Sequence, residues 1–141
     1  MSTQSGTGLM LLQFSAAIAV IAIIVFYPGP WNLARSIGLA IAAPSVALLL
    51  IARSQLGGSF SLTPQARHLV THGLYSRIRN PIYVFGGLTF LGLSLALQKP
   101  ALYIVFIIVI PIQIARAHKE AKVLEERFGD EYRQYREKTW F

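Results

Sequence analysis

The sequence predicts an all-α, polytopic membrane protein with about four transmembrane helices, the last two forming a helical hairpin. The chain has 141 residues, of which 54% are hydrophobic and only 13% are charged, against a usual charged share of roughly 25%. A soluble chain this short cannot bury so much apolar surface in its own core. All six acidic residues stand near the C-terminus, whereas the basic residues before them mostly separate apolar runs, as in the loops of a membrane protein.

Four apolar segments are candidates to cross the roughly 30 Å hydrocarbon layer as helices. They are expected at residues 9–27, 34–52, 82–97 and 101–116. The residues before the first segment carry no charge, which argues against a removed signal peptide. Pro44 predicts a kink in the second segment. Gly92 and Ala96 form a small-xxx-small pair, which favours close contact between helices.

A long polar connection, residues 53–81, separates the second and third spans, and loops of this length are typically functional or disordered. With four crossings, this loop shares one side of the membrane with the N-terminus and with the tail, 117–141. That side carries most of the Lys and Arg residues, so the positive-inside rule places it in the cytoplasm. The sequence therefore predicts one membrane-embedded domain, 1–141, with both termini cytoplasmic.

The tail is expected to begin as a continuation of the fourth helix. Gly129 predicts the end of that helix and Asp130 a new N-cap. The last residues place Tyr132, Tyr135 and Trp140 among basic side chains. This pattern is typical of an amphipathic segment that lies at the lipid headgroups.

Composition and spacing exclude several classes of chemistry. The chain has no cysteine, so it has no thiolate metal site and no cysteine nucleophile. His68 and His72 are four residues apart but have no third ligand nearby, so we expect no metal. The net charge of +7 is spread between apolar runs, so we expect no nucleic-acid partner. The predicted spans lack the carboxylate that a proton-coupled exporter requires.

Two segments remain as candidates for chemistry: residues 68–83, and the pair Arg116 and Glu120. Each has a purely structural explanation. Asn80 and Pro81 suit the N-cap and first residue of the third helix, with the nearby arginines as membrane anchors. Arg116 and Glu120, four apart on a helix, suit an exposed ion pair of small energetic value.

Taken together, these segments carry three motifs in a fixed order. A Leu-Val-Thr-x-Gly-x-Tyr stretch occupies 69–75, and an Arg-Asn-Pro-x-Tyr box occupies 79–83. Arg116 and Glu120 follow, and then Phe-Gly-x-x-Tyr-x-x-Tyr at 128–135. In this combination the chain resembles the isoprenylcysteine carboxyl methyltransferase family, which is related to the phospholipid N-methyltransferases.

The resemblance implies an integral membrane enzyme, of a bacterial-type inner membrane, that binds S-adenosyl-L-methionine in the cytoplasmic loop. By matching position, the cofactor-binding residues are Arg67, His68, Leu69, Val70, Tyr75, Asn80, Pro81, Ile82, Tyr83 and Glu120. Arg116 matches a residue that handles the methyl acceptor, and with Glu120 it forms the predicted catalytic pair. Asn80 replaces the His of better-known members, and Ala121 stands where many relatives have a second Glu.

The function implied is methylation of a lipophilic acceptor, by resemblance an isoprenylcysteine-type carboxylate. A phospholipid amine or a small thiol is the alternative, and either would need a base, for which Glu120 and His118 are the candidates. An NADPH-dependent sterol-type reductase and a non-catalytic membrane scaffold are alternatives of another class. The expected partners are the lipid bilayer and the acceptor; the oligomeric state does not follow from the sequence. All of this requires Tyr83 and Glu120 to meet on one side of the membrane.

Overall fold

The computed structural model describes residues 3–57 and 69–141, and within these residues the fold is helical. In chain order the elements are α1 (Thr3–Phe26), α2 (Leu33–Leu56), the short 3-10 helix η2 (Gly73–Ser76), α3 (Pro81–Leu97), α4 (Pro100–Phe128) and α5 (Asp130–Lys138). The described part of the chain has no strand, and its one pairing of extended backbone is an isolated bridge between Ile78 and Trp140. The predicted all-α class is confirmed.

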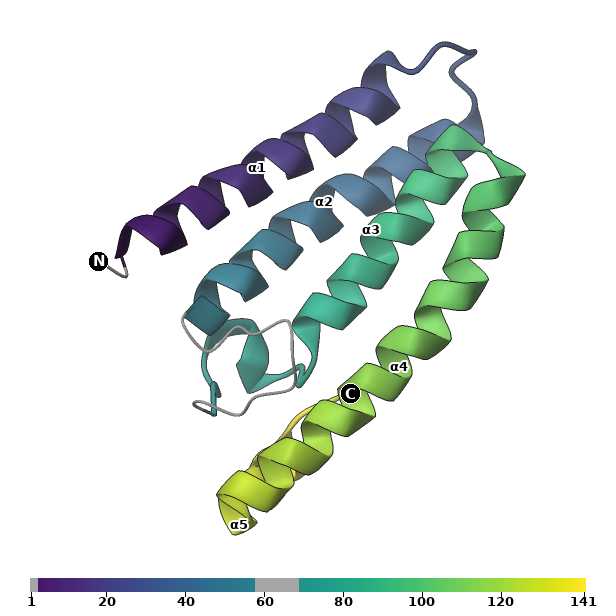
Figure 1. Ribbon diagram of the computed structural model, residues 1–141. Coiled ribbons are helices and arrows are strands. Elements are labelled where there is room, and N and C mark those ends of the chain that lie inside the picture. Colours follow the sequence, from purple (N-terminus) through teal and green to yellow (C-terminus); the bar gives the residue numbers. More distant parts are fainter. Residues whose placement is uncertain (1–2, 58–68) are drawn as a thin grey trace.

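Successive long helices run in alternating directions, as Figure 1 shows. The end of α2, η2, the start of α3 and α5 therefore lie toward one end of the molecule. The connection between α1 and α2 and the turn between α3 and α4 lie at the opposite end. This arrangement brings the loop and the tail together at the same end, which any shared site requires.

The closest helix pair is α2 and α3, which pack through small residues. A Cβ atom added to Gly92 would lie 2.6 Å from the backbone nitrogen of Ala42 and 2.6 Å from the carbonyl oxygen of Gly38. A Cβ atom on Gly38 would in turn collide with the backbone of Ala96. The predicted small-residue pair on α3 is thus a contact surface, and its partner is a second pair with the same spacing on α2.

The end of α1 is held by a buried arginine from α2. The Arg35 guanidinium is 3% exposed and donates hydrogen bonds of 2.7–3.2 Å to the backbone carbonyls of Ile24, Val25, Tyr27 and Gly29. The last carbonyls of a helix have no partner within the helix, so a donor at this position caps it. The predicted second span, 34–52, places Arg35 only at its outer edge, whereas the structure makes it a cap.

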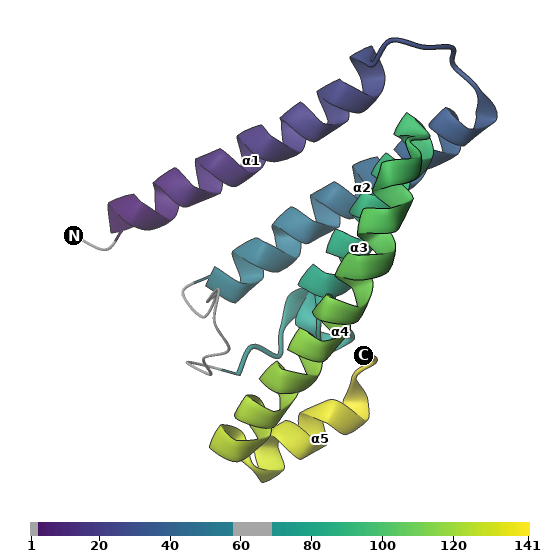
Figure 2. The same ribbon diagram turned by 45° about the vertical axis from the view of Figure 1, so that its right-hand side comes forward.

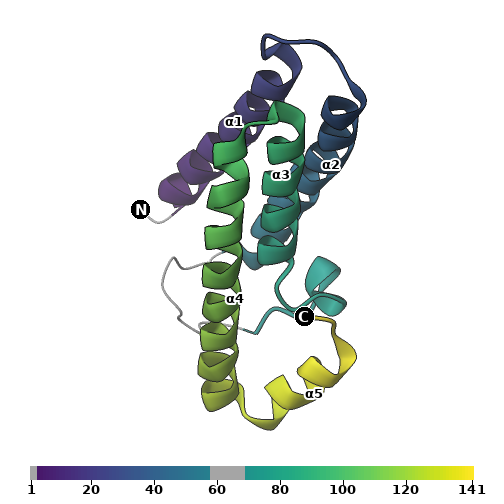
Figure 3. The same ribbon diagram turned by 90° about the vertical axis from the view of Figure 1, so that its right-hand side faces the viewer.

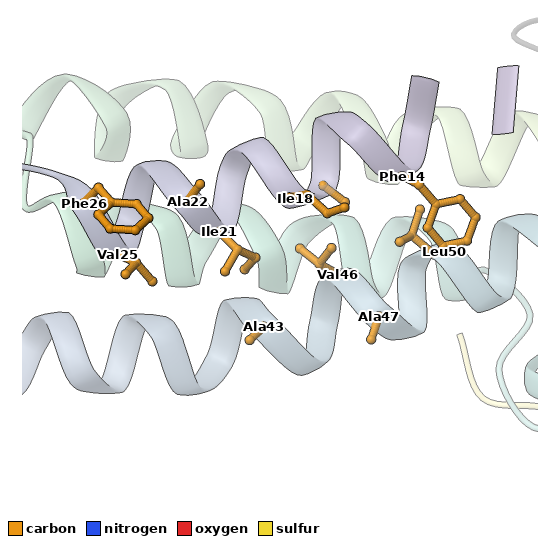
Figure 4. A pocket seen from close by; sticks show the side chains of 11 residues that line it. Phe14, Ile18, Ile21, Ala22, Val25, Phe26, Ala43, Val46, Ala47 and Leu50 are labelled. Atoms are coloured by element: carbon orange, nitrogen blue, oxygen red, sulfur yellow. The ribbon is translucent and has the colours of Figure 1, made fainter. Parts of the chain in front are cut away.

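An apolar groove separates α1 from α2. Its volume is about 420 Å³, and Figure 4 shows Phe14, Ile18 and Ile21 facing Val46 and Leu50 across it. The views agree that α1 stands apart from the closely packed α2 and α3 (Figure 2). The groove therefore opens beside a helix that is fixed mainly at its Arg35 end.

The exposed surface of the first half of α4 is apolar. Ile104, Ile107 and Ile112 are 60%, 69% and 60% exposed, which suits contact with lipid rather than with water. By length and composition, α2 and α4 can each cross a membrane, while the apolar helices Leu11–Phe26 and Pro81–Leu97 are shorter. Two candidate spans are thus observed, and the predicted count of four stays a prediction.

The helix boundaries agree with the sequence at some positions and differ at others. Asn80 precedes α3 and Pro81 is its first residue, as predicted, but the Asn80 side chain makes no capping hydrogen bond. α4 ends before Gly129, whose φ of 52° lies in the region that favours glycine. Gly129 also occupies the N-cap position of α5, so Asp130 begins that helix and is not its cap.

The tail turns two of its aromatic residues inward, and its predicted position at the lipid headgroups stays a prediction. Tyr132 and Tyr135 are only 2% and 9% exposed, because α5 turns back toward the start of α3 (Figure 3). Their rings therefore pack within the protein instead of facing lipid. Trp140, at 65% exposed, is the tail aromatic that remains on the surface.

Candidate functional site

The centre of the candidate site is a hydrogen bond between α3 and α4. The Tyr83 hydroxyl donates to Oε1 of Glu120 at 2.6 Å, a length typical of a phenol bonded to an ionised carboxylate. Tyr83 lies in the first turn of α3, where the ring of the fully buried Pro81 fixes the entry of the chain. Glu120 lies beyond the apolar part of α4. The expectation that these two residues meet is confirmed.

Arg116 completes a row of three polar groups. Its Nε atom lies 3.5 Å from the same Oε1 atom of Glu120, and the two side chains are 38% and 27% exposed. At this distance the contact is an ion pair rather than a close hydrogen bond. A phenol and a cation thus both contact Oε1 of Glu120, while part of the carboxylate remains accessible.

Tyr75 is the buried residue of η2, in the loop that leads to α3. It is 6% exposed, and burial, followed by the proximity of Tyr135 and Glu120, raises the pKa of its phenol well above the ordinary range. Tyr75 therefore stays a neutral phenol at physiological pH. The buried Tyr135 hydroxyl donates a hydrogen bond of 2.7 Å to the Tyr75 carbonyl, which fixes this part of the loop against α5.

The loop around Tyr75 is fixed by residues that the sequence analysis missed. The Gln55 side chain, near the end of α2, accepts a hydrogen bond of 2.8 Å from the backbone nitrogen of Leu74. It fills the space beside Gly73, which has a φ of 61° and where a Cβ atom would collide with it. Its only sequence signal is a single amide beside Arg53 and Ser54 at the polar end of α2.

The predicted site residues fall into three groups. The structure joins Tyr83, Arg116 and Glu120 through direct contacts, and Tyr75 is buried in the loop before α3. Leu69, Val70, Asn80 and Ile82 are half-buried in the loop or at the start of α3, where Pro81 is fully buried. The part of these five residues in cofactor binding stays a prediction. Arg67 and His68 lie outside the described residues.

His118 does not join the site. Its side chain is exposed, and residues two apart on a helix point in different directions. Of the two bases considered for an amine or thiol acceptor, only Glu120 is therefore at the site. Within residues 3–57 and 69–141, no group of three side chains is arranged to hold a metal ion.

The site can attract a cation and an anion at neighbouring points. A partly buried carboxylate backed by tyrosine rings favours a positively charged group. The adjacent guanidinium of Arg116 presents a planar fork that suits a carboxylate or a phosphate. Paired charges of opposite sign just beyond the apolar part of α4 suit a polar cofactor and the headgroup of a lipophilic molecule.

Comparison with known proteins identifies the family. The model of the phospholipid methyltransferase family matches residues 33–131, from the start of α2 to the start of α5. No curated protein and no solved structure matches the chain. The matched family is related to the isoprenylcysteine methyltransferases, which explains the resemblance of the motifs. Because the match covers most of the chain, including the loop, both helices of the site and the ion pair, the chain belongs to the phospholipid methyltransferase family.

Proposed function

We propose that this membrane methyltransferase transfers a methyl group from S-adenosyl-L-methionine to a lipophilic acceptor at the Tyr83–Glu120 site. Members of the family use this methyl donor. The observation that carries the proposal is the 2.6 Å bond between Tyr83 and Glu120, since it joins two motifs from distant parts of the chain. When bound, the donor supplies a positively charged sulfur and an electrophilic methyl group.

The residues at the site fit such a donor. The Glu120 carboxylate and the Tyr83 ring favour the positively charged sulfur, and Tyr75 is a neutral, buried phenol in the loop before α3. The proposed cofactor-binding set is the one implied by the motifs: Arg67, His68, Leu69, Val70, Tyr75, Asn80, Pro81, Ile82, Tyr83 and Glu120. The chain's own task is to align the acceptor with the methyl group, because alignment supplies much of the rate of such a displacement.

For the acceptor we favour a carboxylate of the isoprenylcysteine type. A carboxylate has no proton to lose, so the site needs no base, and Arg116 can orient it through paired hydrogen bonds. Glu120 already accepts a hydrogen bond from the Tyr83 hydroxyl and pairs with Arg116. It is therefore poorly suited to remove a proton from the acceptor. The exposed apolar surfaces of α1 and α4 offer room for a lipid tail.

A phospholipid amine is the second candidate acceptor, and the family match favours it. An amine arrives as an ammonium ion, so it would bind beside Glu120 and would have to lose a proton before methylation.

The location we propose for either acceptor is the inner leaflet of a bacterial-type membrane, with the loop, the tail and the N-terminus in the cytoplasm. The bilayer is then a partner in the reaction, because it delivers the substrate.

The test is methyl transfer from labelled donor, catalysed by the purified full chain in detergent or vesicles. A prenylcysteine analogue and phosphatidylethanolamine are offered separately, over a range of pH. Transfer to the carboxylate at a rate that stays flat above about pH 6 supports the first acceptor, whereas a rate that rises with the titration of a base supports the amine. Binding of NADPH in place of S-adenosylhomocysteine, measured by calorimetry, would point to a reductase, and binding of neither to a scaffold.

A further inference from the structure

The last residues of the described chain pair with the loop that leads into α3. The backbone nitrogen of Trp140 donates to the carbonyl of Arg77 at 2.7 Å, and the carbonyl of Trp140 accepts from the backbone nitrogen of Arg79 at 2.9 Å. The carbonyl of Phe141 accepts from the nitrogen of Asn80, also at 2.9 Å. Three backbone hydrogen bonds therefore fix the residues that immediately precede Pro81.

A fourth hydrogen bond joins α5 to η2. The buried hydroxyl of Tyr135 donates to the backbone carbonyl of Tyr75 at 2.7 Å. That carbonyl belongs to the last turn of a short helix and has no partner within it. Tyr132, packed one turn away on the same face of α5, interacts with Arg79. The inner face of α5 thus contacts η2, through Tyr75, and the residues that lead into α3, through Arg79.

The same segment is attached to the helix that carries Glu120. Gly129 reverses the chain, and its nitrogen bonds to the carbonyl of Glu125 at 2.8 Å. The Glu125 carboxylate pairs with Arg133 at 2.9 Å and with Arg136 at 3.5 Å. α5 therefore leaves α4 at a fixed angle, which Figure 3 shows, and returns to the loop.

We propose that α5 and residues 139–141 act as a strap that positions the loop, 75–80, against α4 and so sets the affinity for the methyl donor. Tyr135 and the backbone nitrogen of Trp140 are its positioning residues; neither is required to touch the donor. This inference rests on the proposed function, because the loop matters only if it holds the donor with Glu120.

The test compares variants that break single bonds of the strap. Trp140→Pro removes the nitrogen that bonds to Arg77, and Thr139, with a ψ of 148°, already has the extended backbone that a following proline requires. Trp140→Ala is the matched control, since it removes the exposed ring and keeps the nitrogen. Tyr135→Phe removes only the hydroxyl. For each variant, calorimetry in detergent gives the affinity for S-adenosylhomocysteine, amide exchange reports on Arg79 and Asn80, and thermal unfolding gives the stability.

The strap predicts a pattern that a merely structural contact would not give. In Trp140→Pro and Tyr135→Phe, the affinity should fall by roughly 3- to 10-fold, as expected for the loss of one hydrogen bond, with the helical fold retained. Trp140→Ala should bind as the wild type does. Faster amide exchange at Arg79 and Asn80 with unchanged affinity for S-adenosylhomocysteine would overturn the proposed strap and leave the proposed function standing. A wild-type chain that binds no S-adenosylhomocysteine would overturn the proposed function, and the strap with it.

Discussion

Tyr83 and Glu120 stand 37 positions apart in the sequence, and a hydrogen bond of 2.6 Å joins their side chains. The bond connects the first turn of α3 to the part of α4 that extends past its apolar span. Both helices contribute one polar group at the same level, beside the loop that carries Tyr75. The candidate site is therefore a junction of loop, hairpin and tail rather than a pocket within one helix pair.

Replacement of Glu120 by Gln keeps the shape of the side chain and removes its charge. We expect Glu120→Gln to weaken binding of S-adenosylmethionine by roughly tenfold, a loss typical of one charge contact near a protein surface. Binding of S-adenosylhomocysteine, which lacks the positive charge on sulfur, should change less. Calorimetry measures both ligands, and Glu126→Gln is the control, because Glu126 is exposed on the same helix. Equal losses for the two ligands would contradict a charge contact with the sulfur.

Arg116 is expected to serve the acceptor more than the donor. Arg116→Lys retains the charge but loses the planar fork, so kcat/KM for a carboxylate acceptor should fall by about tenfold or more. The affinity for the donor should stay within about twofold of the wild type. Steady-state methyl transfer gives kcat/KM and calorimetry gives the affinity for the donor. The control is Arg127→Lys, the same change at an exposed position of α4. If donor affinity falls as far as kcat/KM, then Arg116 belongs to the donor site.

The contact between α2 and α3 should tolerate no added methyl group. Gly92→Ala places a Cβ atom against the backbone of Ala42 and Gly38, which should cost about 1–3 kcal/mol of stability. Gly86→Ala, in the same helix, adds a methyl group where nothing lies within 4 Å and should stabilise by about 0.5–1 kcal/mol. Unfolding in detergent, followed by circular dichroism, compares the two. A Gly92→Ala chain as stable as wild type would contradict the close packing.

Alkaline pH should release the tail. Burial, with a smaller contribution from the adjacent Tyr132, raises the pKa of Tyr135 to about 12, against about 10 for an exposed tyrosine. Because the folded pKa is the higher one, the stability due to the neutral phenol is complete below about pH 10 and is lost as the pH rises to about 12. Ultraviolet titration of phenolate formation should show that the Tyr135 phenol ionises at this high pH. Tyr135→Phe should remove it and flatten the loss of stability over that interval.

Much of the fold follows from composition and small-residue spacing. The apolar runs predict the long helices because a helix satisfies its own backbone polar groups in lipid. Gly92 and Ala96 predict a close contact, but the sequence alone does not say which helix they meet, since that depends on how the spans are arranged. Arg35 shows the same limit: its cap on α1 requires the carbonyls of another segment to lie beside it.

The site was accessible from the sequence only through its motifs. Spacing places Arg116 and Glu120 on one helix, but the meeting of Glu120 with Tyr83 depends on the turn between α3 and α4. The tail was harder to predict, because buried Tyr132 and Tyr135 have the same pattern as an amphipathic segment on a membrane. Gln55 gave almost no indication, since a single amide at a helix end is common and only its distance from Leu74 reveals its role.

The arginine that closes α1 also determines what can be removed from the chain. Without the first helix, the Arg35 guanidinium would lose the carbonyl oxygens of Ile24 and Val25 that now accept its hydrogen bonds, and it would stand unpaired on the apolar surface of α2. An uncompensated charge in an apolar interior costs several kcal/mol. The N-terminal helix, although only loosely packed along its length, is thus an integral part of the body that supports the site, and shortened versions of this enzyme will need a neutral residue in place of Arg35.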